Sequence, residues 1–62
     1  MTMDAEEQKL FRKYAITARK HGGNDAYSWA VFVGNRAVYN GLQQREVLYY
    51  KRQALQIEQK KA

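Results

Sequence analysis

The stretch 29–39, WAVFVGNRAVY, constrains the fold most because two β-rich runs flank a pair of turn residues. Gly34 and Asn35 separate the runs, and two such residues between alternating apolar positions are typical of a tight β-hairpin. The segments before and after this stretch have helical rather than alternating periodicity. The predicted order of elements is therefore helix, hairpin, helix.

Both faces of the predicted hairpin are apolar, because side chains alternate along a strand and both sets are hydrophobic here. A two-residue turn pairs Val33 with Arg36, Phe32 with Ala37, Val31 with Val38 and Ala30 with Tyr39. A two-stranded ribbon is not stable alone, so each face needs another element to cover it. Either the two helices cover one face each, or both cover one face and a second copy of the chain covers the other; we expect a homodimer.

A first helix is predicted from about Asp4 to about Lys20. Asp4 is a suitable N-cap with Glu7 as its capping-box partner, and His21-Gly22-Gly23 provides a stop. One face of this helix is apolar and carries Leu10, Phe11, Tyr14 and Ala18. The opposite face surrounds a single apolar residue, Ile16, with cations: Lys9, Arg12, Lys13, Arg19 and Lys20.

A second helix is predicted from about residue 41 to about residue 60, with Asn40 as its N-cap. Two apolar ridges run along it. The first ridge is Val47, Tyr50, Ala54 and Ile57, and the second is Leu48 and Leu55. A helix with two ridges can contact two surfaces, one of which is the hairpin.

These elements predict one α+β domain over residues 1–62, with a helix at about 4–20, an antiparallel two-stranded β-hairpin at about 27–39 and a helix at about 41–60. A chain of this length buries only about 60% of its unfolded surface. It has no cysteine, so no disulfide adds stability. Association with a second copy would supply burial that one chain lacks.

Residue types needed for catalysis or metal binding are scarce. The chain has one histidine, His21, and no cysteine, whereas a metal site needs three or four ligands. Ser28 has no recognisable partner base. We therefore expect no enzymatic activity, no metal, no cofactor and no small-molecule substrate.

Positive charge is the strongest functional signal. The net charge is +5, and residues 9–62 carry all eleven lysines and arginines. Cations neutralise phosphates, and an exposed aromatic ring can stack on an unpaired base. We predict nucleic-acid binding with little sequence preference, DNA or RNA, through Lys9, Arg12, Lys13, Lys20, Arg45, Tyr49 and Arg52.

The alternative function is a protein-interaction module or inhibitor that binds a host protein through apolar surface. Its predicted interface residues are Ile16, Leu48 and Leu55, together with the open edge of the hairpin. Apolar binding depends little on salt, whereas phosphate binding weakens steeply as salt rises. The number of cations favours nucleic acid, and the apolar residues outside the expected core favour a protein.

The sequence also predicts the compartment. No uninterrupted apolar run approaches the ~20 residues of a membrane span, and the first eight residues are acidic, unlike a signal peptide. The missing cysteines fit a reducing environment. We expect a cytoplasmic protein that has no membrane partner.

The segments 29–34 (WAVFVG), 38–42 (VYNGL) and 49–52 (YYKR), with Glu46, resemble a pattern of small orphan proteins encoded by bacteriophages. In that pattern an aromatic-led hairpin continues into a helix through a short polar-Gly-Leu joint. The resemblance covers residues 29–52. It implies a phage or prophage accessory protein acting in the host cytoplasm, and it carries no binding residue across.

Overall fold

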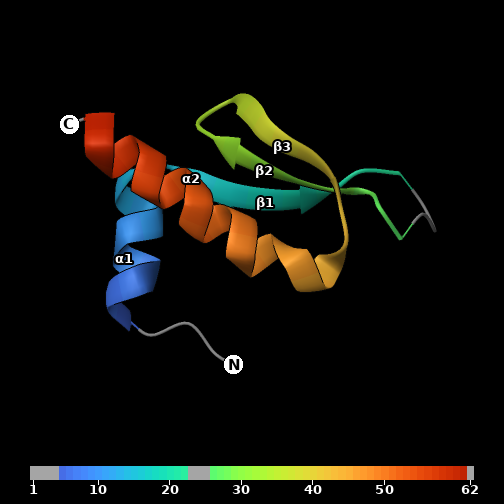
Figure 1. Ribbon diagram of the computed structural model, residues 1–62, viewed down its shortest axis with the longest axis horizontal. Helices are drawn as coiled ribbons and strands as arrows, with labels where there is room; N and C mark the ends of the chain where they lie inside the picture. The colour runs from blue at the N-terminus through green and yellow to red at the C-terminus, as the bar shows by residue number, and fades with distance from the viewer. Residues whose placement is uncertain (1–4, 23–25, 62) are drawn as a thin grey trace.

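The computed structural model describes residues 5–22 and 26–61, in which two helices pack on a three-stranded antiparallel sheet (Figure 1). The element order is α1 (Ala5–Lys13), β1 (Ile16–Lys20), β2 (Trp29–Val33), β3 (Arg36–Leu42), a 3-10 turn η1 (Gln44–Glu46) and α2 (Val47–Lys61). The strand order is β1-β2-β3, so β2 is central. The α+β class is confirmed, but the predicted two-stranded hairpin between helices is wrong.

The additional strand β1 replaces the second half of the predicted first helix, which ends at Lys13 rather than near Lys20. β1 pairs with β2 in antiparallel register, from Ile16 opposite Val33 to Lys20 opposite Trp29. The reason is tertiary, because an apolar strand such as β2 exposes an unpaired backbone edge until another strand covers it. Helical periodicity over 4–20 is a local preference that this long-range pairing outweighs.

This change from helix to strand moves residues that the helical pattern placed on one basic face. Ile16, expected among exposed cations, is only 3% exposed and belongs to the core. Arg19 and Lys20 lie on β1 and not on α1. The proposed N-cap Asp4 and the stop residue Gly23 lie outside the described residues.

The turn between β2 and β3 is predicted correctly. Gly34-Asn35 form it, and the adjacent pairs are the expected ones, Val33 with Arg36 and Phe32 with Ala37. Gly34 has a φ of +62°, and a positive φ at the first turn position alone is typical of a type II′ turn. Its backbone N–H donates to the carbonyl of Ala15 at 2.9 Å, which ties the turn to the chain between α1 and β1.

Beyond the turn, the register between β2 and β3 shifts, so the remaining expected pairs are wrong. Val31 pairs with Tyr39 and Trp29 with Leu42. The extra residues on β3 are β-bulges, and Gly41 has a φ of +69° that glycine adopts without strain. The bulges lengthen β3 as far as Leu42, which places residues 40–42 in the sheet instead of the second helix.

The second helix consequently begins later than the predicted residue 41, and Asn40 is not its N-cap. Gln43 takes that position: its backbone N–H donates to Oε1 of Glu46 at 2.8 Å, as in a capping box. α2 follows η1 directly and ends at Lys61, close to the predicted end.

The core lies between one face of the sheet and the two helices. Its buried members come from both helices and all three strands: Phe11, Ile16, Val31, Leu42, Ala54 and Leu55. The apolar face predicted for the first helix is confirmed at Leu10, Phe11 and Tyr14, which all pack in this core. One cluster therefore holds the described elements together.

On the other sheet face, side chains from β1 and the residue after it pack beside Phe32. Phe32 is buried, with the Arg19 guanidinium 4.5 Å and the His21 ring 5.7 Å from its ring centroid. Arginine stacks favourably on an aromatic face. Ala30 and Phe32 are thus buried within one chain while Ala37 is exposed, and the homodimer stays a prediction.

Candidate functional site

α1 presents three cations on one side of the helix. Lys9, Arg12 and Lys13 are exposed, and their spacing of i, i+3 and i+4 places them on the same face. Phe11 points the other way and is buried in the core. We call Lys9, Arg12 and Lys13 the α1 basic face.

A hollow of about 360 Å³ lies beside this face and is lined by Gln8, Phe11, Arg12, Ile16 and Lys51. Nζ of Lys51 lies 4.5 Å from the centroid of the Phe11 ring. Burial lowers the pKa of Lys51 below its ordinary value, while the nearby Glu7 carboxylate acts in the opposite direction. Arg12 and Lys51 therefore bring two cations to one concave site with an apolar floor.

Arg52 joins α2 to α1 instead of extending into solvent. Its Nε donates to Oε2 of Glu7 at 2.7 Å, and its Nη2 donates to Oε1 at 3.2 Å. A bidentate pair of this kind is geometrically specific and neutralises the arginine locally. Arg52 was predicted to bind nucleic acid. In the structure its guanidinium instead holds α2 to α1 through Glu7.

The remaining predicted contacts lie elsewhere. Lys20 is the last residue of β1 and Arg45 lies in η1, and Figure 1 shows both elements ending on the side of the molecule away from α1. Tyr49 is 59% exposed at the start of α2, with its ring edge-on to Tyr50 at 5.1 Å. The structure therefore does not bring the seven predicted residues onto one surface.

The residues predicted for a protein interface are part of the folded core. Ile16 and Leu55 are buried, and Leu48 packs against the same cluster. Both outer edges of the hairpin were expected to be open; the edge of β2 is paired with β1, whereas β3 is an edge strand of the sheet. Ile16, Leu48 and Leu55 therefore do not form the exposed apolar surface that the alternative function needs.

Sequence reasoning missed Lys51, which is not among the seven residues predicted to bind nucleic acid. Its only signal was its place in the run 49–52 (YYKR), next to Arg52. Its position depends on Phe11 and Glu7, both on α1. Local periodicity carries no information on such a contact.

Within residues 5–22 and 26–61 no helix is both long and apolar enough to cross a bilayer. The same residues contain no group of three His, Cys, Asp or Glu side chains that could hold a metal ion. Comparison of the chain with family descriptions, curated proteins and solved structures finds no significant match. A function is therefore proposed from the geometry and charge of the described surfaces alone.

Proposed function

We propose that the protein binds nucleic acid, with little sequence preference, through the α1 basic face and Lys51. The observation that supports this most is that the α1 basic face adjoins a hollow lined by two cations from two helices, Arg12 and Lys51. None of the four cations of the α1 basic face and Lys51 lies within 4.0 Å of a carboxylate oxygen in the described part of the chain. Cations arranged in this way can neutralise phosphates, which is the main source of non-specific affinity.

The balance of charges supports the same function. Three of the four described carboxylates have local partners: Glu7 binds Arg52, Glu58 binds Lys61, and Glu46 accepts from the backbone of Gln43. Glu6, the fourth, lies in the first turn of α1, and Glu7 also favours the charged form of Lys51, so the cations of this site outnumber the carboxylates near them. An excess of positive charge on one side of the molecule attracts a polyanion and speeds its association.

Little sequence preference follows from the residue types. Lysine and arginine side chains on an exposed helix face contact phosphates readily, and phosphate contacts carry no sequence information. Tyr49, the exposed ring expected to stack on bases, lies on α2 and does not line the hollow. Backbone contacts therefore dominate the proposed interface.

The test is the salt dependence of binding to a labelled mixed-sequence DNA duplex, measured by fluorescence anisotropy. The triple variant Lys9→Gln, Arg12→Gln, Lys13→Gln removes up to three phosphate contacts. The log–log slope of affinity against salt between about 50 and about 200 mM should then become shallower by about 2 to 3. Far-UV circular dichroism should stay unchanged, because exposed helix charges contribute little to stability.

A charge-matched control tests whether a change in slope comes from loss of the α1 basic face or only from the lower net charge. The variant Lys20→Gln, Arg45→Gln, Lys60→Gln removes the same net charge from exposed positions outside the hollow. It should keep the wild-type slope within about one unit. Equal losses in the two variants would contradict the assigned face, and absence of binding by the wild type at low salt would refute the function.

A further inference from the structure

A second cavity lies at the C-terminal half of α2, apart from the α1 basic face. Ile57 continues the apolar stripe of Tyr50 and Ala54, yet it is 48% exposed whereas Ala54 is 2% exposed. The sheet does not cover the helix at this point. A cleft of about 230 Å³ lies between α2 and the β2–β3 hairpin.

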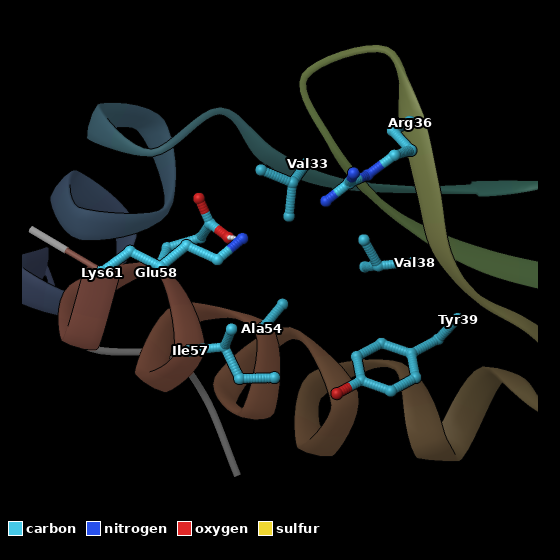
Figure 2. A pocket seen from close by; sticks show the side chains of 8 residues that line it. All are labelled: Val33, Arg36, Val38, Tyr39, Ala54, Ile57, Glu58 and Lys61. Carbon is cyan, nitrogen blue, oxygen red and sulfur yellow. Dashed lines mark ion pairs between the residues drawn. The ribbon is translucent and has the colours of Figure 1, made fainter.

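The cleft combines an apolar floor with a polar mouth. Figure 2 shows Val33, Val38, Ala54 and Ile57 facing one another across the gap, while the ring of Tyr39 bounds one end. Arg36 extends from the start of β3 across the mouth towards Glu58 and Lys61. A concave, mostly apolar surface with a few polar groups is the usual form of a small-molecule site.

The mouth has one positive charge in excess. Nζ of Lys61 pairs with Oε2 of Glu58 at 3.1 Å, so these two charges offset each other. Arg36 has no carboxylate oxygen within 4.0 Å in residues 5–22 and 26–61. A planar guanidinium matches a carboxylate with two parallel hydrogen bonds.

We propose that this cleft binds a small monocarboxylic acid, with its aryl or alkyl part on the apolar floor and its carboxylate on Arg36. The volume is below the ~300 Å³ at which pockets for drug-sized ligands begin, so a single ring or a short chain fits. The Glu58 carboxylate disfavours a second negative charge at the mouth, which selects a monoanion over a phosphate ester. This ligand class differs from the sequence expectation of no small molecule.

The probe is 3-phenylpropionate, with its uncharged amide, 3-phenylpropionamide, as the matched control. Each compound is titrated to about 10 mM into isotopically labelled protein and followed by NMR. This range is enough to measure a Kd of about 1 mM. We expect methyl signals of Val33, Val38 and Ile57 to shift in saturable fashion with the acid. The amide should bind about tenfold more weakly, because it lacks the charge-assisted bonds to Arg36.

Two variants test the role of the cation. Arg36→Gln should weaken binding of the acid about tenfold and leave binding of the amide unchanged, whereas Arg45→Gln, the same change on η1, should affect neither ligand. Equal affinity of acid and amide for the wild type would overturn the proposal without any variant. Shifts spread over residues outside the cleft, or no saturation, would overturn it as well. Failure of nucleic-acid binding leaves these outcomes unaffected.

Discussion

At the scale of single residues, Ala15 has a left-handed backbone conformation, which alanine rarely adopts. Its φ of +56° makes it the one non-glycine residue with a positive φ in the described part of the chain. Its N–H donates to the Arg12 carbonyl at 3.1 Å and its carbonyl accepts from Gly34. The left-handed conformation is needed where the chain leaves α1 and enters β1, and it costs an alanine about 1–2 kcal/mol.

Replacement of Ala15 with glycine should therefore stabilise the protein. Relief of the left-handed strain exceeds the added chain entropy of glycine, so the free energy of unfolding should rise by about 0.5–1 kcal/mol. Urea denaturation measures this as a higher midpoint with an unchanged slope. The control is Ala37→Gly on β3, an exposed position without a positive φ, which should lose a similar amount. A loss in both variants would show that Ala15 is not strained.

Lys51 provides the prediction on pH. Burial lowers its pKa below the ordinary 10.5, against the smaller opposing influence of Glu7. Between the folded pKa and the unfolded pKa the unfolded chain binds more protons, so the free energy of unfolding contributed by Lys51 increases with pH across that window. The destabilisation is fully present below the folded pKa and is relieved as the pH rises through it.

The measurement is the pH titration of the Lys51 side-chain carbon signal by NMR, in the folded protein and in urea. The folded midpoint should be the lower of the two. Glu7→Gln should lower the folded midpoint further, because it removes the carboxylate that favours the ammonium form. A folded midpoint at or above the value in urea would contradict the assigned burial.

At the scale of elements, the boundary between α1 and β1 decides the fold. Residues 14–20 continue the periodicity of a helix, but they form the turn and strand that pair with β2. Pairing buries Ile16 and satisfies the backbone edge of β2, and these gains outweigh a helix propensity of a few tenths of a kcal/mol per residue. A segment whose sequence is compatible with both helix and strand adopts the structure that its tertiary contacts favour.

Ile16→Ala tests this assignment directly. In a strand of the core the substitution leaves a cavity and should reduce the free energy of unfolding by about 2–4 kcal/mol. On an exposed helix face the same change would cost well under ~1 kcal/mol. Ile57→Ala, on the half-exposed face of α2, is the matched control and should have the small effect. Chemical denaturation measures the free energy of unfolding of both variants and so distinguishes a core strand from an exposed helix face at Ile16.

At the scale of the whole molecule, the excess of positive charge opposes the compact state. The net charge is +5, and most described carboxylates already have local partners. Repulsion among exposed cations falls as salt shortens the screening length. The molecule that attracts a polyanion should therefore be destabilised by its own charge at low salt.

The expected result is a thermal midpoint that rises by about 2–4 °C between about 20 mM and about 300 mM sodium chloride at neutral pH. The triple Gln variant of the α1 basic face should show a smaller rise, because three of the repelling charges are gone. Circular dichroism during heating measures both midpoints. A midpoint that falls with salt would mean that attractive pairs such as Arg52–Glu7 dominate the electrostatic free energy.

The sequence by itself determined the features that depend on neighbours along the chain. Gly34-Asn35 specified the turn because few residues adopt a positive φ, and the two pairs next to it followed from the turn length. The apolar face of α1 and most of the extent of α2 followed from the 3.6-residue period. The α1 basic face of the proposed site was predictable for the same reason.

Tertiary structure alone decided the third strand, the bulges in β3 and the partners of the charged side chains. Ile16 pairs with Val33, Arg52 with Glu7, and Lys51 packs over Phe11. Each contact joins segments that lie far apart in the sequence, and its free energy comes from burial and pairing that a local pattern does not contain. Lys20, predicted on the first helix, was separated from α1 by the same kind of long-range pairing, that of β1 with β2.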